Sequence, residues 1–438
     1  MLRKSFYIFL LTLTQAAIAQ AQYIFRSVED IWKYADVHNI TILTAKYETN
    51  KALYSKLQSY SNVLPQATLT GSFTDNTALQ TTLIPDELFG GPAGSYRAVA
   101  FGQKYIYTGA ITAQVDILNL QNWFNVQIAK KTEDYNKASL GNTRKTIYQQ
   151  VATQYYNYLL MQEAARLAGL SESIADSVFQ SVSNKFKEGN VNEANVDLSK
   201  MNLERAQQTT ITAQYQMQSS KNNLKALLGL SLHDSLVFES TLENSLSVAA
   251  DAPMQEDPSI RQAFYQSQIS LGQYKAANSS FLPTLTLAYY NSTQQYDNKY
   301  EPFQGGPAWF PATYWNLKAT WNIFNSGGKL FQSKRNKIGY DETHLQYENA
   351  KTQSVINDEN LRLSYQRSLL LLQKTEDVMK LSYDNYSHIS YRYQAGIQSL
   401  DDRLNAFSDY INYQNQYLNT LSDMLLQLYQ LKIRQQSF

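Results

Sequence analysis

Apolar and polar residues alternate in four short segments of the chain. The clearest is residues 315–323, whose apolar face consists of Trp315, Leu317, Ala319, Trp321 and Ile323. Residues 67–73, 109–117 and 284–289 have the same period of two, which predicts strands with one apolar and one polar face. Such strands suit a membrane barrel with a lipid face and a wet lumen. Alternation alone favours the other possibility, a soluble sheet packed on its own helices.

Two further segments predict very long helices. Residues 123–186 contain no proline and two glycines, and residues 329–393 contain no proline and one glycine. At a rise of 1.5 Å per residue each helix would run to roughly 100 Å, which no compact domain contains. Each segment is followed by a glycine where the chain must reverse, Gly189 or Gly396, and then by a return helix. The second return helix carries a seam at alternating steps of four and three, the spacing of a coiled coil: Leu400, Leu404, Phe407, Ile411, Gln414, Leu418, Leu421, Leu425 and Leu428.

The two halves of the chain repeat each other. Segment 64–69 is similar to 282–287, segment 116–119 to 322–325, and segment 185–189 to 392–396, in the same order. Chance repetition of several markers in one order is improbable, so we expect an internal duplication with the plan helix, strand, loop, strand, very long helix, turn, helix. The predicted divisions are a signal peptide at 1–21, repeat one at 22–235, a linker in an equatorial belt at 236–257, and repeat two at 258–438.

The first residues have the features of a secretory signal. Arg3 and Lys4 precede an apolar stretch at 6–13, and small residues allow cleavage after Ala19 or Ala21. No later run approaches the about 18 apolar residues that a spanning helix needs. The chain has no cysteine, which excludes disulfides, cysteine-ligated zinc and an N-terminal lipid-modified cysteine. We therefore expect an exported protein that enters a membrane, if at all, as a closed β-barrel.

Charge and motif content argue against an enzyme and against a nucleic-acid partner. Lys and Arg number 38 against 37 Asp and Glu, so the basic excess typical of nucleic-acid-binding proteins is missing. The four histidines are scattered, and the sequence has no phosphate loop, dinucleotide fingerprint or nucleophile elbow. We predict no catalytic residue, metal site or cofactor. The 33 tyrosines suit interfaces and membrane belts, although a compositional habit would explain them as well.

Four strands per chain cannot close a barrel, because the smallest membrane barrels have about eight. An open sheet in lipid would leave the hydrogen-bonding groups along its edges unsatisfied. The apolar seams of the two helical hairpins also need partners that one chain does not supply. Symmetric copies arranged in a ring meet both requirements, so we predict an oligomeric tube of strands that continues into helices.

Several short motifs recur at defined places in this plan. They are Leu64-Pro65 and Phe281-Leu282-Pro283 before the strands, Asp257-Pro258-Ser259-Ile260 opening the second half, the start Ala35-x-x-His38-Asn39, and the Phe/Tyr-x-x-Gly turns. Taken together, they resemble the TolC-like outer-membrane efflux duct family over essentially the whole mature chain. The resemblance implies a mixed α+β membrane protein. Four strands per protomer would form part of a trimeric twelve-stranded outer-membrane barrel, continued by a long periplasmic α-helical barrel.

The resemblance also implies a function and partners. The homotrimer would be the passive exit duct of a tripartite efflux or type I secretion system and would export small molecules, including drugs, or proteins. It would dock to a periplasmic adaptor protein and an inner-membrane pump of the RND or ABC type, and it would be surrounded by outer-membrane lipid.

In this family, acidic side chains form rings where the tunnel narrows at the helix tips. The two acidic positions fall on Asp402, which is kept, and on Asn405, which carries no charge, while a basic position just after the glycine is Gln398 here. An ion-pair latch known from some members is therefore not expected. Asp401 and Asp402 would still ring the opening and favour cations, although a solvated helix N-terminus explains the two carboxylates too. Gly189 and Gly396 are the turns at which we expect adaptor docking.

Two long loops, 75–107 and 292–312, would face the cell exterior. Four tryptophans near strand ends fit either an interfacial aromatic belt or buried packing: Trp123, Trp309, Trp315 and Trp321. Two other functional classes remain open. A periplasmic adaptor uses one long helical hairpin, usually with an inner-membrane anchor, and a soluble coiled-coil scaffold would leave the strands and the export signal unexplained.

Overall fold

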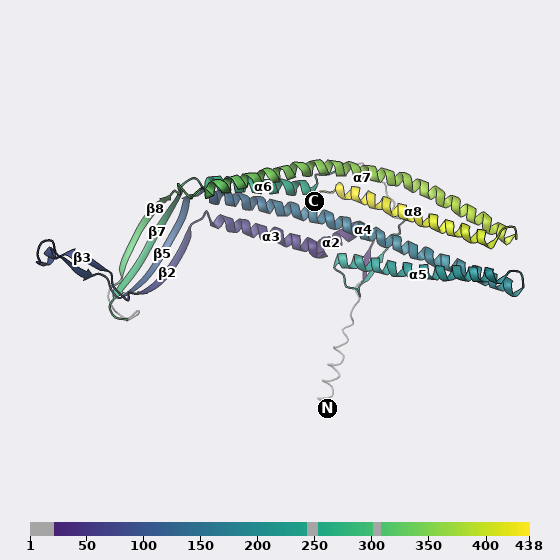
Figure 1. Cartoon of the computed structure of the whole chain (residues 1–438), viewed down its shortest axis with the longest axis horizontal. Helices are drawn as coiled ribbons and strands as arrows, with labels where there is room; N and C mark the ends of the chain where they lie inside the picture. The colour runs from purple at the N-terminus through teal and green to yellow at the C-terminus, as the bar shows by residue number, and fades with distance from the viewer. Residues whose placement is uncertain (1–21, 243–252, 301–307) are drawn as a thin grey trace, which may run out of the picture. The chain divides into compact units, whose positions relative to one another are not determined.

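The computed structural model describes residues 22–242, 253–300 and 308–438 (Figure 1). The predicted signal peptide and part of the predicted linker lie outside the described residues. The chain divides into two compact units, of which unit 1 comprises residues 1–49, 136–263 and 347–438 and unit 2 comprises residues 50–135 and 264–346. Within the described residues, no helix is both long and apolar enough to cross a membrane.

Unit 2 contains one antiparallel four-stranded sheet in the order β2-β5-β7-β8 (Figure 1). The strands are β2 (Gln66–Asp75), β5 (Tyr105–Leu118), β7 (Thr284–Asp297) and β8 (Phe310–Thr320). Their register aligns the alternating residues, because Ala67 pairs with Ala113, Ala113 with Tyr289, and Tyr289 with Trp315. All four predicted strands are confirmed.

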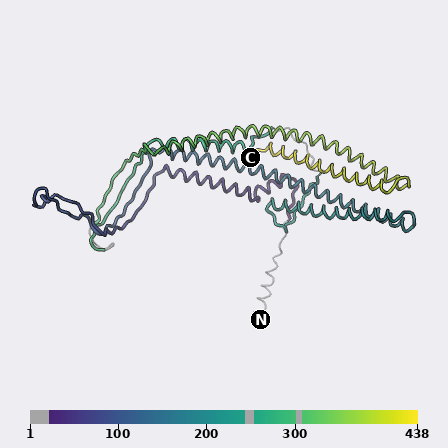
Figure 2. The backbone as a smooth tube through the Cα atoms, in the orientation of Figure 1, coloured from purple at the N-terminus to yellow at the C-terminus, as the bar shows by residue number. Residues whose placement is uncertain are grey.

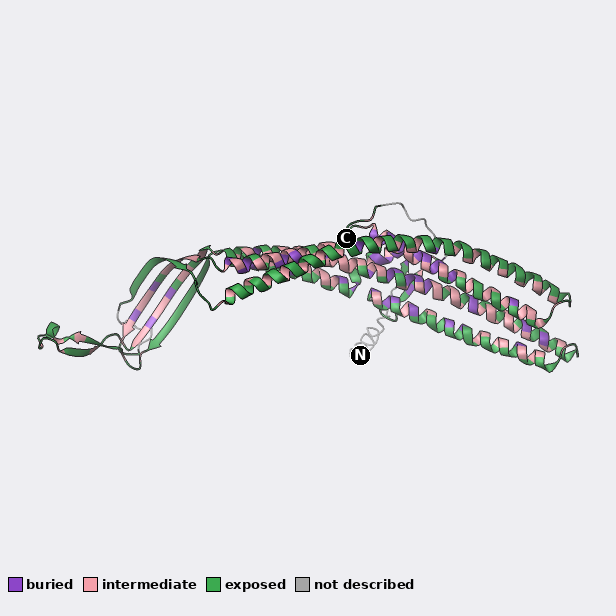
Figure 3. Ribbon diagram, turned by 45° about the horizontal axis from the view of Figure 1, so that its top comes forward, coloured by how far each residue is buried: buried purple, intermediate pink, exposed green. Residues whose placement is uncertain are grey.

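The apolar face of this sheet is exposed in the single chain. Leu69, Trp315 and Leu317 have 77%, 69% and 62% of their surface exposed. The two outer strands, β2 and β8, are exposed along their whole length, whereas β5 and β7 are partly buried (Figure 3). The alternation therefore does not serve packing against helices of the same chain.

The boundaries of β8 and of the two predicted loops differ from the expectation, and the second loop, 292–312, is shorter because β7 runs to Asp297 and β8 begins at Phe310. The alternation continues to Ile323, but β8 ends at Thr320. Directly after the strand, the indole N–H of Trp321 donates to the Phe281 carbonyl at 3.0 Å, a contact outside the sheet. The segment 75–107 is not a plain loop, because it folds into a hairpin of β3 (Thr81–Pro85) and β4 (Tyr96–Ala100). Trp123, Trp309, Trp315 and Trp321 are all between 43% and 69% exposed, which excludes buried packing within one chain.

The two very long helices are confirmed. They are α4 (Leu120–Lys187) and α7 (Gly328–Gln394), and each returns through a short turn into α5 (Glu193–Leu228) or α8 (Leu400–Arg434). The backbone trace reverses at the two turns (Figure 2). Shorter helices precede the strands in each half, α3 (Ile40–Ser61) and α6 (Pro258–Ser279). The duplicated plan of the sequence is thus present in the fold.

The core of unit 1 forms around the middle of α4. Val151, Tyr155, Tyr156 and Leu159 of α4 are at most 2% exposed and belong to one cluster with apolar residues of α5 and α8. The cluster includes three elements that the sequence pattern does not predict: α2 (Val28–His38) and the parallel strands β1 (Gln22–Phe25) and β6 (Ser235–Phe238).

Asn39 explains part of the motif Ala35-x-x-His38-Asn39. Its side-chain oxygen accepts a hydrogen bond from the Ile42 N–H at 3.1 Å, and its amide donates to the Leu227 carbonyl at 2.8 Å. The residue is only 5% exposed. One amide therefore caps the start of α3 and attaches that start to the end of α5.

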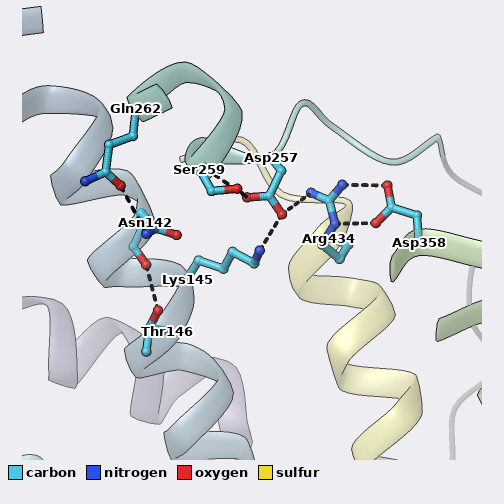
Figure 4. A network of polar contacts seen from close by, with 8 residues as sticks. All are labelled: Asn142, Lys145, Thr146, Asp257, Ser259, Gln262, Asp358 and Arg434. Carbon is cyan, nitrogen blue, oxygen red and sulfur yellow. Dashed lines mark hydrogen bonds and ion pairs between the residues drawn. The ribbon is translucent and has the colours of Figure 1, made fainter. Parts of the chain in front are cut away.

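A buried polar cluster joins the helices of unit 1 near the start of α6 (Figure 4). Arg434 of α8 binds both carboxylate oxygens of Asp358 in α7 at 2.7 Å, and its guanidinium lies 3.7 Å from Asp257. Asp257 also accepts from Lys145 of α4 and from the N–H and hydroxyl of Ser259 at 3.0 and 2.8 Å. Burial opposes ionisation of Asp257, but the bonds from Lys145 and Ser259 outweigh it and lower the pKa of this carboxyl group. The motif Asp257-Pro258-Ser259-Ile260 thus caps α6 and links α4, α7 and α8.

Candidate aperture at the helix tips

The two tip turns of unit 1 have the same backbone geometry. Gly189 and Gly396 have φ of +77° and +73°, in the left-handed region that favours glycine. In the first turn the N–H groups of Gly189 and Asn190 bind the carbonyls of Phe186 and Lys185 at 2.9 and 2.8 Å. The second turn repeats this pair of bonds, from Gly396 to Tyr393 at 3.0 Å and from Ile397 to Arg392 at 2.9 Å. Both turns are therefore Schellman motifs that end a long helix at a defined residue.

Each return helix begins with a side-chain cap three residues after its glycine. The Asn192 side chain accepts from the Asn195 N–H at 3.1 Å, and the Ser399 hydroxyl accepts from the Asp402 N–H at 3.1 Å. Because glycine and cap recur at the same spacing, the duplication extends to the details of the tips. Neither glycine has a neighbour within 4 Å of a Cβ built on it, so both turns are open on that side.

The structure brings Gln398 and Asp402 together. The Asp402 carboxylate accepts from the Gln398 amide at 2.7 Å and from the Ser399 hydroxyl at 2.6 Å. These hydrogen bonds from Ser399 and Gln398 lower the pKa of Asp402, so the residue carries its negative charge at neutral pH. Gln398 occupies the position at which the family often has a basic residue. In this chain that position therefore supplies an uncharged hydrogen-bond donor.

Asp401 and Asn405 are exposed on the same helix, four residues apart. That spacing places them on one face of α8, next to Asp402 at the tip. The second tip thus carries two adjacent carboxylates in the first turn of a helix, where the helix dipole also stabilises negative charge.

A contact between the two tips involves residues that the sequence does not single out. The Lys185 ammonium at the end of α4 lies 4.9 Å from the centre of the Tyr393 ring and 3.5 Å from its hydroxyl. The Arg403 guanidinium of α8 lies 5.2 Å from the centre of the same ring. Two cations therefore share one aromatic ring, at about 0.5–1 kcal/mol for each exposed cation–π contact. A recognisable signal is the basic and aromatic pair that recurs before the two tip glycines, Lys185-Phe186 and Arg392-Tyr393.

A groove of about 270 Å³ lies between the two helical hairpins behind this contact. Ile174 and Val178 of α4, Ala206 of α5, and Tyr386 and Phe407 of the second hairpin line its apolar part. Arg205 and Arg403 add two cations. Tyr386 packs on Phe407 with ring centres 5.2 Å apart, which fixes the groove wall on the second hairpin.

Comparisons with known proteins agree with this architecture. A model of the family described as "Outer membrane efflux protein" matches residues 34–230 and 251–432. The chain belongs to the outer membrane efflux protein family. A search of curated proteins found no significant match.

Solved structures of outer membrane proteins share the fold. The chain is similar to the outer membrane protein VceC of Vibrio cholerae, at 16% identity, with 94% of this chain and 96% of that chain covered and a TM-score of 0.74. It is similar to the open state of the MtrE outer membrane channel of Neisseria gonorrhoeae, at 16% identity, 93% and 88% coverage and a TM-score of 0.77. It is also similar to the CmeC outer membrane channel of Campylobacter jejuni, at 16% identity, 93% and 85% coverage and a TM-score of 0.71.

Membership of the outer membrane efflux protein family confirms several predictions. The protein acts as an efflux exit duct of the outer membrane, with its long helices in the periplasm, and it is not an enzyme. The adaptor and scaffold classes are therefore set aside. The family also works with adaptors and inner-membrane pumps.

Proposed function

We propose that three copies of this chain form one passive duct. Strands β2 and β8 each have one neighbour in the four-stranded sheet, so each presents an open edge. Pairing β2 of one copy with β8 of the next removes both edges, and three copies of a four-stranded sheet supply twelve strands. The exposed apolar face then lies against lipid and the polar face lines the lumen. The number of copies follows the resemblance to the TolC-like ducts.

The helical part supports the same assembly. In unit 1, α7 exposes Ile356, Leu363 and Leu370, seven residues apart, with 46%, 53% and 68% of their surface accessible. In unit 2 the same helix exposes Phe331, Ile338 and Leu345, again seven residues apart, at 67–70%. Seven-residue repeats of apolar side chains are typical of helices that pack side by side. We assign these stripes to helices of a neighbouring copy.

The proposed mechanism rests on the two adjacent carboxylates at the second tip, Asp401 and Asp402. In a trimer, Asp401 and Asp402 of the three copies would form two adjacent acidic rings that favour cations. The Lys185–Tyr393–Arg403 contact holds the two tips of one copy together and takes the place of the ion-pair latch. Opening requires that this contact separate, and the protein has no energy source of its own for this step.

The partners that we propose are a periplasmic adaptor and an inner-membrane pump of the RND or ABC type. The adaptor would contact the tip turns at Gly189 and Gly396 and the groove beside them, whose Arg205 and Arg403 suit acidic side chains. Residues 236–257 would belong to an equatorial belt between repeats 22–235 and 258–438, and residues 1–21 would be removed on export.

Planar-bilayer conductance tests the aperture. We expect the wild-type channel to have low conductance and a preference for cations. The double variant Asp401→Asn/Asp402→Asn should lose most of that preference, and the control Glu359→Gln, which removes an exposed carboxylate far along α7, should keep it. A preference unchanged in the double variant would assign the two carboxylates to helix capping alone.

A further inference from the structure

The β3–β4 hairpin of unit 2 stands apart from the four-stranded sheet. It is inserted between β2 and β5, its strands pair with each other, and among the described strands they pair with no other. A 3-10 turn, η1 (Asp86–Phe89), joins the two strands. Five large apolar side chains in the hairpin and directly after it have between 56% and 74% of their surface exposed: Leu83, Leu88, Phe89, Tyr96 and Phe101. Because an isolated two-stranded hairpin is marginally stable in water, these side chains require a covering surface.

The tip of the hairpin nevertheless has a defined shape. Asp86 binds Arg97 at 2.9 Å, and the Arg97 guanidinium lies 5.4 Å from the centre of the Phe89 ring. Glu87 accepts from the Gly94 N–H at 2.8 Å. A Cβ at Gly91 would lie 2.5–2.9 Å from atoms of the Asp86 side chain, so a larger residue there would displace Asp86. The charged groups are therefore used within the hairpin, and its outward surface is mainly apolar.

This surface does not suit lipid. In hydrocarbon the two open edges of a two-stranded ribbon would leave N–H and carbonyl groups unsatisfied. Anionic headgroups attract free cations, and the single cation of the ribbon, Arg97, is already held by Asp86. A protein surface that is also exposed and aromatic fits better.

The place of the hairpin in the sheet identifies that surface. The hairpin leaves β2 at Asp75, which pairs with Tyr105 of β5. The start of β8 at Phe310 pairs with Gln294 of β7 and lies at the same end of the sheet, on the opposite edge. When β2 of one copy adjoins β8 of the next, the hairpin of the first copy arrives beside Trp309 and Phe310 of the second. Both residues are exposed, at 43% and 54%.

We propose that the β3–β4 hairpin is a clasp between copies, which packs its Leu83 and Tyr96 face on Trp309 and Phe310 of the neighbouring copy. Leu83 pairs with Ala98 and Pro85 with Tyr96, so Leu83 and Tyr96 share one face of the ribbon, and Thr82 lies on the other. The clasp covers apolar surface on both copies and strengthens the seam where their edge strands meet. This inference rests on the homotrimer proposed above.

Cross-linking tests the clasp directly, because the chain has no cysteine of its own. The double variant Leu83→Cys/Phe310→Cys, oxidised in outer membranes, should give a ladder up to a covalent trimer on a denaturing gel without reductant. The control Thr82→Cys/Phe310→Cys, with its first thiol on the opposite face, should remain largely monomeric. A mild-detergent gel of the same samples reports whether the trimer itself has formed.

The possible results separate the two proposals. An intact trimer with a ladder in the first variant alone supports the clasp. An intact trimer that gives only monomers in both variants overturns the clasp and leaves the homotrimer standing. Absence of a trimer in the parent protein overturns the homotrimer, and the clasp with it. As a second readout, Leu83→Ser/Tyr96→Ser should lower the temperature at which the trimer dissociates, and Thr82→Ser should not; equal temperatures would also contradict the clasp.

Discussion

Helices α4 and α7 come from equivalent places in the two repeats and have nearly the same length, 68 and 67 residues, yet they differ in burial. The middle of α4 forms the core of unit 1, with Val151 and Tyr155 at 0% and 1% exposure. The buried residues of α7 are two serines, Ser354 and Ser368, and most of its leucines are exposed. Figure 3 shows α7 as a largely exposed helix. The comparison shows that equivalent helices of the two repeats differ in role: α4 packs in the core of unit 1, whereas α7 is mostly exposed and repeat two contributes to that core mainly through its return helix α8.

The largest expected effect concerns the main polar attachment of α7 to the core. Arg434→Met should lower the free energy of unfolding by about 3–5 kcal/mol, because Asp358 and Asp257 would lose a buried cation. This free energy is measured by thermal or denaturant unfolding, with the helical circular dichroism signal as the readout. The control Arg392→Met, at an exposed position, should unfold like the parent, and equal stability of both variants would contradict the role given to the cluster.

Truncation of one leucine on α4 and one on α7 distinguishes a residue of the single-chain core from a residue of the proposed surface between copies. Leu159→Ala on α4 should cost about 2–5 kcal/mol of folding stability, because it leaves a cavity. Leu363→Ala on α7 should leave unfolding of the dissociated chain within about 0.5 kcal/mol of the parent, as for other exposed positions, and should lower the dissociation temperature of the trimer. If Leu363→Ala changed unfolding as much as Leu159→Ala, α7 would be part of the single-chain core.

Removal of the contact between the two tips should change the free energy of the protein less than these core substitutions. Tyr393→Leu removes the ring that Lys185 and Arg403 share, with a loss of about 1–2 kcal/mol for two cation–π contacts. We expect more frequent openings and a higher mean conductance in planar bilayers. Tyr391→Leu serves as the control, because Tyr391 is exposed and, two residues before Tyr393, lies on another side of the helix. Identical conductance of the two variants would show that the ring does not hold the tips.

The smallest effect is the pH dependence of the polar cluster. The pKa of Asp257 is lower in the folded protein than in the unfolded chain, where a carboxyl titrates near pH 4. Its contribution to stability is therefore complete above about pH 4 and is lost as the pH falls through the lowered folded pKa. In a pH series of unfolding experiments, the stability of Asp257→Asn should not show this loss at acid pH. If the free energy of unfolding of Asp257→Asn changed with pH in parallel with that of the parent, the lowered pKa of Asp257 would not contribute to stability.

Repetition and periodicity account for most of what the sequence predicts correctly. The four strands and the four helices of the two hairpins follow from period-two alternation, from the lack of proline and from the tip glycines. The start of α6 follows from Asp257 and Pro258. These features are local, so one sequence is sufficient to identify them.

The elements that the sequence does not predict depend on distant partners. Strands β1 and β6 are four residues each and pair across more than two hundred positions, so neither has a pattern of its own. Helix α2 starts at a local cap, where the Ser27 side chain accepts from the Asp30 N–H, but its place in the core depends on Trp32, whose ring centre lies 5.1 Å from that of Tyr148. At the candidate aperture, Asp402 and Gln398 could be named from the sequence, but the Lys185–Tyr393–Arg403 contact requires two tips brought together by the fold.

The mass of the undenatured protein, extracted in detergent and measured by native mass spectrometry, tests the central claim most directly. The account predicts a single species of three chains, because the open edges of β2 and β8 and the exposed stripes of α7 are satisfied only in a closed ring. A stable monomer or dimer with the same helical content would contradict it, since the apolar surface of α7 and of the sheet would then be exposed to detergent alone.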